Sequence, residues 1–355
     1  MPDAGGGRPT RPLNVQVTKM KLSTTTISCC VLGLLLLACD RQVPSPPVAD
    51  AQMRKITIAE TGVSPPALLL YIARDQGYYV DEGLTVEFTT RFGYGKANIQ
   101  AVMEGKADIC TASETPVMRA GLADQPVRVL ATIGSAERHM AVVGRLDRGI
   151  ETLGDLADKR LGVTVGSNAE YFFDAFLQMR GLPDIKVEKT HFAPTALAGA
   201  LEQGEVDAIV SWFPNWMRAQ NLLGSNAQRF FGDGFYSVFM NLLVNDRFVS
   251  ERPAEAAAFL RALVRAEQFA RDHPDAALAA FQKQLKLSEA VAKDVFPNYH
   301  LRVRLGQELL LTLEDQARWV IRKGLTDRAD LPNYLHYVHT EPLASVAPAA
   351  VTIIR

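Results

Sequence analysis

From Lys55 onward, the pattern of apolar and polar positions alternates between short strand-like runs and longer helical ones. Ile56 and Ile58 alternate with polar neighbours as in a half-buried strand, whereas Ile99 and Val102 lie at helical spacing. Strands that alternate with helices predict crossover units and a mostly parallel sheet. In this first part of the chain, the pattern predicts strands around residue 57 and over residues 84–88, 107–111 and 127–133.

The same alternation restarts near residue 139. Here the pattern predicts a helix over residues 169–180 and strands over residues 141–144, 160–165, 185–187 and 207–210. A local repeat joins the two parts, because a Gly-x-x-Asp motif precedes a strand at residues 105–108 and again at residues 204–207. In both copies a proline, Pro116 or Pro214, follows where the next helix is expected. We therefore predict two similar α/β lobes rather than one long sheet.

The last third of the chain is nearly all helical in its pattern. The predicted helices cover residues 254–272, 274–285, 288–295 and 306–324. Residues 340–355 lack a helical period, so we expect them to form a peripheral C-terminal tail.

Composition places the chain among ordinary globular proteins. Its 355 residues are 48% hydrophobic and 22% charged, which excludes wholesale disorder. The net charge of −1 argues against a nucleic-acid partner, because phosphate binding needs a basic surface. The charge is unevenly distributed, since residues 1–38 hold four basic groups and one acidic group. A basic leader before a mildly acidic body suggests export.

The leader has the composition of a signal peptide. Lys19 and Lys21 precede an apolar run over residues 27–38, which is shorter than the roughly 20 residues needed to span a bilayer. A charged segment followed by a short apolar one is typical of a signal peptide. Residues 1–19 look like an upstream extension, and Met20 is a plausible start.

The apolar run ends in Leu36-Leu37-Ala38-Cys39, which resembles the lipobox of bacterial lipoproteins. The resemblance implies cleavage before Cys39 and lipidation of its thiol. The alternative is an ordinary secretory signal with an incidental cysteine. Residues 39–53 are rich in proline, which favours an extended tether between the membrane and the globular body.

Cysteine usage fits this interpretation. Cys29 and Cys30 would leave with the leader, so Cys110 would be the one free thiol of the mature chain. A single thiol forms no intramolecular disulfide, and no Cys/His spacing suggests a metal site. We expect Cys110 to be a small buried hydrophobe, with a nucleophilic role as the alternative.

Residues 66–86 resemble the opening of a known family. The stretch Pro66-Ala-Leu-Leu-Leu-Tyr-Ile-Ala-Arg-Asp-Gln-Gly-Tyr-Tyr-Val-Asp-Glu-Gly-Leu-Thr-Val86 is similar to that of solute-binding proteins of ABC importers, specifically the nitrate/sulfonate/taurine and thiamine-precursor binding proteins. The two Gly-x-x-Asp motifs, the segment over residues 153–163 and Trp212-Phe-Pro214 match the same pattern. The resemblance covers roughly residues 55–300.

The resemblance implies the type II periplasmic-binding fold, an α/β architecture of two lobes. Each lobe would be a small, mostly parallel sheet flanked by helices, with a helical C-terminal tail. Lobe 1 would comprise residues 54–138 and 236–339, and lobe 2 residues 139–235. The hinge crossings would fall near residues 133–139 and 235–241, with the ligand between the lobes.

Candidate ligand-binding residues follow from the strand ends. In open α/β sheets, ligands bind beyond the carboxyl ends of strands, where helix N-termini present free N–H groups. Four turns meet this description: Glu60-Thr61-Gly62, Ser113-Glu114-Thr115, Gly166-Ser167-Asn168 and Ser211-Trp212-Phe213. At each turn the alternative is a plain helix cap.

Further candidates surround these turns. Trp212 and Tyr236 would add apolar walls, with plain lobe packing as the alternative for Trp212. Arg91 would pair with an anion or stay solvated, and Glu137, at the first crossing, would contact the ligand or only set the hinge. Carboxylates lie in or beside the same turns, at Glu60, Glu114, Glu137 and Glu170. Their mixture with helix N-termini predicts an organic ligand, with zwitterionic sulfonates and pyrimidine-like compounds ahead of nitrate.

The predicted function is ligand capture without catalysis. No convincing catalytic triad, metal site or cofactor motif is present in the sequence. The family resemblance implies a monomeric, membrane-tethered protein on the periplasmic face, which delivers a small molecule to an ABC permease in the inner membrane. The alternatives are an enzyme of cofactor biosynthesis with the same fold, or a ligand-sensing lipoprotein. The carboxylate at Glu114, where sulfonate binders commonly carry a small polar residue, leaves the ligand open.

Overall fold

The computed structural model describes residues 53–60, 64–92 and 95–354. The predicted leader over residues 1–38, the lipidated Cys39 and, except for Met53, the tether over residues 39–53 lie outside the described residues. Thr61 and Gly62 of the first candidate turn also lie outside them.

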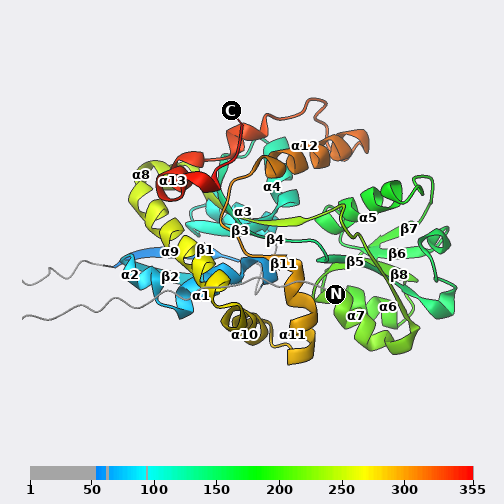
Figure 1. The fold of residues 1–355 in the computed structure, drawn as a ribbon. Coiled ribbons are helices and arrows are strands. Elements are labelled where there is room, and N and C mark those ends of the chain that lie inside the picture. Colours follow the sequence, from blue (N-terminus) through cyan, green and yellow to red (C-terminus); the bar gives the residue numbers. More distant parts are fainter. Residues whose placement is uncertain (1–52, 61–63, 93–94, 355) are drawn as a thin grey trace, which may run out of the picture. The chain divides into compact units, whose positions relative to one another are not determined.

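A six-stranded sheet, with its flanking helices, forms what we term the first lobe (Figure 1). Its strand order is β11-β4-β10-β3-β1-β2, and the strands span β1 (Arg54–Ala59), β2 (Leu84–Thr89), β3 (Ile109–Ser113), β4 (Val127–Ala136), β10 (Val238–Asn245) and β11 (Tyr299–His300). β1 pairs in parallel with β2 and β3, whereas β10 pairs antiparallel with β3 and β4. The buried apolar residues of β1, β3 and β10 make these strands the centre of the core.

Helices cover both faces of this sheet. In the view of Figure 1, one face carries α4 (Glu114–Leu122) and α12 (Gln307–Arg322), and the other carries α10 (Pro274–Leu285) and α11 (Glu289–Val295). The remaining helices of this lobe are α1 (Leu68–Asp75), α2 (Tyr78–Asp81), α3 (Gly95–Met103), α8 (Asp246–Glu251), α9 (Pro253–Asp272) and α13 (Thr340–Val346). The C-terminal helices thus complete the first lobe.

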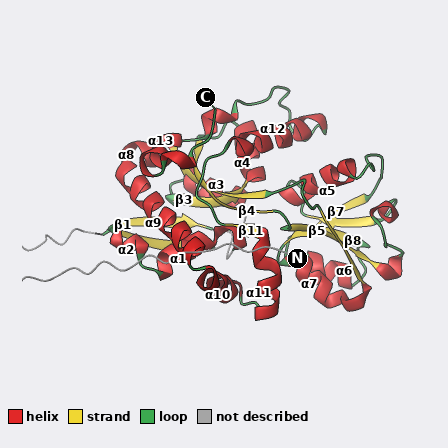
Figure 2. Cartoon of the chain, viewed as in Figure 1, coloured by secondary structure: helices red, strands yellow, loops and turns green. Residues whose placement is uncertain are grey.

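A five-stranded sheet forms the second lobe. Its order is β7-β6-β8-β5-β9, with strands β5 (Met140–Arg145), β6 (Arg160–Val163), β7 (Glu188–His191), β8 (Ala208–Trp212) and β9 (Ala227–Phe231). Helix α5 (Asn168–Met179) lies on one face, and α6 (Leu197–Glu202) and α7 (Asn215–Leu223) lie on the other (Figure 2). The chain passes between the lobes twice, between β4 and β5 and again between β9 and β10.

The predicted fold class is confirmed, but both sheets are mixed rather than mostly parallel. β6 pairs in parallel with β7 and β8, whereas β5 pairs antiparallel with β8 and β9. The physical reason lies in the two connections between the lobes. They place β10 in the first lobe and β5 in the second in the direction opposite to the strands of the crossover units, and hydrophobic alternation carries no information about direction.

Two local predictions were wrong. The strand expected over residues 185–187 instead spans Glu188–His191, and Ile185 and Val187 pack against the core from irregular backbone. The C-terminal tail is not peripheral throughout, because α13 packs against α9 with Leu343 fully buried. This helix is too short to show a helical period in the sequence.

Close backbone approach shapes the wall of the first lobe next to the cavity described below. A short 3₁₀ turn over Pro65–Ala67 packs against β4 at Gly134, where an added Cβ would lie 2.1 Å from the carbonyl oxygen of Pro66. Only glycine fits at such a contact. The turn therefore holds Ser64 and Pro65 at the boundary between the lobes.

Candidate ligand-binding site

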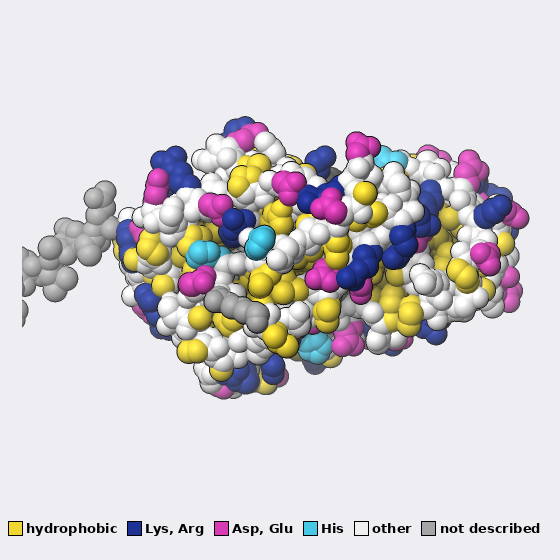
Figure 3. Space-filling model, turned by 90° about the horizontal axis from the view of Figure 1, so that it is seen from above, with side chains coloured by type: hydrophobic (Ala, Val, Ile, Leu, Met, Phe, Trp, Pro, Cys, Tyr) yellow, Lys and Arg dark blue, Asp and Glu magenta, His cyan; other side chains and the backbone are white. Residues whose placement is uncertain are grey.

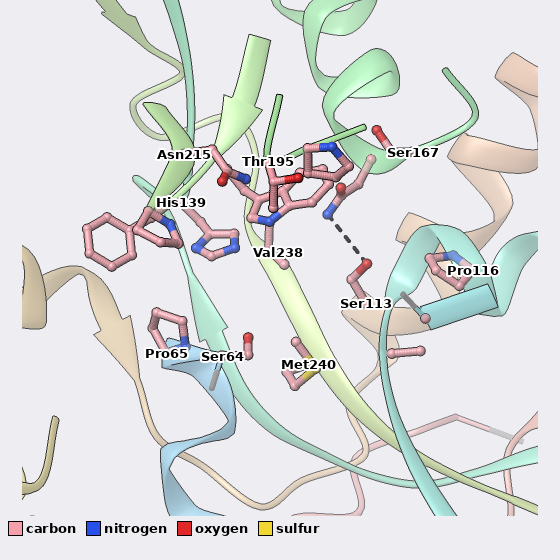
Figure 4. Close-up of a pocket in the computed structure, with 17 residues that line it drawn as sticks. Ser64, Pro65, Ser113, Pro116, His139, Ser167, Thr195, Asn215, Val238 and Met240 are labelled. Atoms are coloured by element: carbon pink, nitrogen blue, oxygen red, sulfur yellow. Dashed lines mark hydrogen bonds between the residues drawn. The ribbon is translucent and has the colours of Figure 1, made fainter. Parts of the chain in front are cut away.

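A cavity of about 270 Å³ lies between the two lobes (Figure 4). At about 30 Å³ per water molecule, this volume equals roughly nine waters, which suits a small organic molecule. Its lining comprises Ser64, Pro65, Gly95, Ala112, Ser113, Pro116, His139, Ser167, Asn168, Pro194, Thr195, Trp212, Phe213, Pro214, Asn215, Val238 and Met240. Both lobes and both crossings therefore contribute to one site.

Four helices begin at the cavity. Ser113 precedes α4, Ser167 precedes α5, and Gly95 and Asn215 are the first residues of α3 and α7. The first-turn N–H groups of a helix lack partners within the helix, and its N-terminus carries a partial positive charge. The arrangement therefore favours a ligand that presents an anionic or strongly accepting group to these termini.

The two candidate serines differ in how far their hydroxyls are engaged. Ser167 caps α5, since its Oγ accepts a hydrogen bond from the N–H of Ala169 at 3.2 Å and donates to Thr164 O at 2.6 Å. Ser113 makes no such cap bond to α4. Its Oγ instead lies 3.4 Å from Nδ2 of Asn168 across the cavity (Figure 4). Ser113 thus has greater freedom to bond a ligand.

The lining carries no Asp, Glu, Lys or Arg side chain among the described residues. Its one titratable imidazole group is His139, which is buried against Tyr299, with Nδ1 3.1 Å from the tyrosine hydroxyl. Burial lowers the pKa of His139 to about 3, so the imidazole is neutral near pH 7. The positive helix termini therefore face the cavity without an opposing carboxylate in its wall.

Three of the four predicted carboxylates, Glu60, Glu114 and Glu170, are engaged inside the protein instead of facing the cavity. Tyr71 donates its hydroxyl to Glu60, and burial raises the pKa of that carboxyl against the opposing effects of Tyr71 and Arg74. Glu170 accepts a hydrogen bond from the N–H of Gly166 at 2.8 Å and lies 3.4 Å from Lys189. Because these carboxylates do not face the cavity, they give no reason to expect a cationic group on the ligand.

The remaining predicted residues divide between lining and supporting positions. Ser113, Ser167, Asn168 and Trp212 line the cavity. Glu114 and Tyr236 are buried beside it and bonded to each other, and Thr115 donates its hydroxyl to Gln316 at 2.7 Å. Arg91 and Glu137 are exposed: Arg91 lies over the Phe92 ring, and Glu137 lies 3.8 Å from His300. None of these supporting or exposed residues belongs to the lining.

Sequence reasoning missed several lining residues. Pro194 and Thr195 follow β7, so the rule that ligands lie beyond strand ends would have found them had the strand been placed at residues 188–191. Val238 and Met240 come from a crossing strand that is apolar except for Asn241 and the terminal Asn245, and this pattern gives no sign that one side faces a cavity. Their place depends on the tertiary arrangement.

Contacts between the lobes surround one side of the cavity. Arg119 on α4 donates from Nε to the carbonyl oxygen of Gly166 at 3.1 Å, where the glycine has a φ of +80°. Further along, Trp319 on α12 donates from Nε1 to Asp174 on α5 at 3.2 Å. On this side the lobes are therefore in direct contact.

Metal binding, membrane-spanning helices and nucleophilic catalysis by a thiol have little support in the described part of the chain. No group of three or more His, Cys, Asp or Glu side chains there is arranged to hold a metal ion, and none of its helices is long and apolar enough to cross a membrane. Cys110 is buried as predicted, and burial raises the pKa of its thiol, which disfavours the nucleophilic thiolate.

The fold and site define a class of protein: two α/β lobes joined by two crossings with a small cavity between them, as in the periplasmic-binding fold. Residues 64–277 match the family model described as "NMT1/THI5 like". Because this match covers more than half of the chain, the protein belongs to the NMT1/THI5-like family.

Relatives and solved structures agree with this assignment. The taurine-binding periplasmic protein of Escherichia coli (strain K12) is 23% identical over 228 residues, which cover 64% of this chain and 69% of the relative. The alkanesulfonate-binding protein SsuA from Xanthomonas axonopodis pv. citri, solved bound to MOPS, superposes with a TM-score of 0.67 at 17% identity, covering 81% of this chain and 98% of that one.

The fold also occurs in an enzyme. The desulfurization enzyme DSZB superposes with a TM-score of 0.62 at 18% identity, covering 83% of this chain and 99% of that one. At these identities the superpositions show a shared fold, so function has to be argued from the site of this chain.

Proposed function

We propose that this protein is the solute-binding component of an ABC importer, which captures a small organic molecule between its lobes and delivers it to a permease. The observation that carries the proposal is the cavity between the lobes, where four helix N-termini meet a lining without carboxylates. Taurine binding by the Escherichia coli relative and alkanesulfonate binding by SsuA support it.

The preferred ligand is a small organic sulfonate. Its anionic head would accept hydrogen bonds from the helix N-termini and from Ser113, and its organic part would contact Trp212 and Met240. A pyrimidine-like compound is the second candidate, because a neutral lining with the Trp212 ring also suits a polar heterocycle.

Binding is proposed to proceed without catalysis. Cys110 is buried, and the low pKa of His139 makes its imidazole a poor general base at neutral pH. On ligand binding, lobe 1 (residues 54–138 and 236–339) and lobe 2 (residues 139–235) would close as units about the crossings.

The cellular setting is part of the same proposal. Cleavage before Cys39 and lipidation would anchor a monomer on the periplasmic side, where it meets the permease of the inner membrane. Acidic and basic side chains are both present on the face shown in Figure 3, and the proposal includes no nucleic-acid partner.

A ligand screen tests the function. Purified protein would be titrated calorimetrically with taurine, ethanesulfonate, nitrate and 4-amino-5-hydroxymethyl-2-methylpyrimidine, and its thermal unfolding followed with each. We expect one sulfonate to bind stoichiometrically and to stabilise the fold by about 2.7 kcal/mol at 100 times its Kd. Recovered ligand should be chemically unchanged. Multiple-turnover conversion, or no binding by any compound, would contradict the proposal.

A further inference from the structure

Glu114 is the first residue of α4, directly after the cavity-lining Ser113, yet its own side chain points into the protein. Its Oε2 accepts a hydrogen bond from the backbone N–H of Phe239 at 2.9 Å. Its Oε1 accepts from the Tyr236 hydroxyl and lies 3.3 Å from Nε2 of Gln316. One carboxylate therefore binds both sides of the second crossing, where the chain enters β10.

Tyr236 is the first residue of the second range assigned to lobe 1, but its ring packs within the second lobe. Its ring lies in the hydrophobic cluster under α5, with ring centroids 5.8 Å from both Tyr171 and Phe172 and 6.1 Å from Phe235. Its hydroxyl nevertheless bonds a carboxylate fixed on α4 of the first lobe. A rotation of the second lobe about the crossings would carry the ring with it, so that this bond would stretch or break.

The carboxylate itself is held in place. Thr115 donates its hydroxyl to Oε1 of Gln316 at 2.7 Å, which orients the Gln316 amide so that its NH₂ group faces Glu114. Burial raises the pKa of Glu114, while the hydrogen bonds from Tyr236, Phe239 and Gln316 act in the opposite direction. Removing one donor leaves a fully buried acceptor less satisfied, which is costly.

We propose that Glu114 is a positioning residue for ligand binding, which holds the lobes in the arrangement that forms the cavity through its bonds to Tyr236 and Phe239 and without contacting the ligand. The inference rests on the proposed function, because the cavity is taken to be the ligand site. On this proposal, the strength of the Glu114–Tyr236 hydrogen bond helps to determine how readily the lobes separate.

The test compares Tyr236→Phe with a matched control, Tyr334→Phe. The control removes a buried hydroxyl that donates to Met118 O on the same helix α4 at 2.8 Å, within the first lobe. Amide hydrogen exchange of the unliganded full chain, resolved by peptide mass spectrometry, reports local opening. We expect exchange over residues 234–241 to rise about 10-fold in Tyr236→Phe, the effect of losing one buried hydrogen bond, and to stay at the wild-type rate in the control.

Glu114→Gln provides a second variant in case Tyr236→Phe folds poorly. The amide of glutamine would place its NH₂ group against either the Phe239 N–H or the donors at Tyr236 and Gln316, so we expect the same local rise in exchange. A rise spread evenly over all peptides, or equal rates in the Tyr236 and Tyr334 variants, would overturn the proposal.

Taurine titration of the same proteins separates the proposed ligand-binding function from the proposed role of Glu114. We expect Tyr236→Phe to weaken binding about 10-fold through the shifted lobe equilibrium, with the Tyr334→Phe control unchanged. If wild type binds neither taurine nor the rest of the panel, the proposed function fails while the exchange result still decides the role of Glu114. If taurine binds all variants equally, the role of Glu114 in ligand binding is refuted and the proposed function stands.

Discussion

Nδ2 of Asn168 lies 3.4 Å from Oγ of Ser113, so the first residue of α5 contacts the residue that precedes α4 in the other lobe. Both side chains line the cavity. The two helix N-termini are therefore brought together by direct contact between the lobes. A ligand that bonds both termini would reinforce the same contact.

The first prediction concerns Asn168→Ala. The change removes the amide at the cavity but leaves Ser167 as the cap of α5, so the helix should persist. We expect sulfonate affinity to fall about 5- to 10-fold, which corresponds to the net worth of one hydrogen bond. Isothermal titration calorimetry measures the effect.

Ser288→Ala is the control for that experiment. Ser288 caps α11, outside the cavity lining, by accepting a hydrogen bond from the N–H of Val291 at 3.4 Å. It should cost about 1 kcal/mol of stability with no change in affinity. Equal affinities of wild type and Asn168→Ala would exclude a binding role for the Asn168 amide.

The second prediction concerns the aromatic wall at Trp212. Trp212 is half-buried at the end of β8 and lines the cavity. We expect Trp212→Ala to weaken the binding of an organic sulfonate about 10-fold or more and Trp212→Phe to restore most of it, because an aromatic ring retains the apolar contact. Nitrate, titrated in parallel, should respond less, since it has no apolar part. If the Ala and Phe variants bind the sulfonate equally well, Trp212 is a packing residue.

The layout of the fold was largely predictable from the sequence, and its exceptions have identifiable physical causes. Ile56 and Ile58 alternate strictly, so β1 was predictable from local pattern. The antiparallel direction of β5 and β10 was not, because it follows from the route of the chain between the lobes. Helix α13 was missed because it is stabilised by packing of Leu343 rather than by a local period.

The site was predictable only in part. Ser113, Ser167 and Trp212 follow from the rule that ligands lie beyond strand ends, since each is at the end of a strand or the start of a helix. The inward orientation of Glu114 was not predictable, because its neighbours Tyr236 and Gln316 are 122 and 202 residues away in the chain. Side-chain direction at a helix N-terminus depends on such long-range partners.

The third prediction concerns Cys39, which lies outside the described residues. If the lipobox-like sequence directs lipidation, the wild-type chain should become labelled in a bacterial host that is fed labelled palmitate. The labelled chain should be bound to the membrane and should be released from it by detergent. Cys39→Ala should be unlabelled and free of the membrane, while Cys110→Ala should behave as wild type because Cys110 is buried. Equal labelling of wild type and Cys39→Ala would contradict lipidation at this position.

The fourth prediction concerns stability in mild acid. His139 has a pKa of about 3 in the folded protein because it is buried, against an ordinary value of 6.5. Between these two pH values the unfolded chain binds more protons than the folded one, so the free energy of unfolding rises with pH. The contribution of the neutral His139 to this free energy is therefore lost as the pH falls through this window. From pH 7 to pH 5 the loss attributable to His139 should be about 2 kcal/mol.

Urea unfolding of wild type and His139→Asn at pH 7 and pH 5 isolates this contribution. Asparagine retains a group near the Nδ1 position that can bond the Tyr299 hydroxyl. Glu60 and Glu114 have raised pKa values and therefore act in the opposite direction, but they are common to both proteins and cancel in the difference. We expect wild type to lose about 2 kcal/mol more than His139→Asn. If His139→Asn loses as much stability as wild type, the imidazole is not held neutral by burial, and the cavity would carry a positive charge at pH 5.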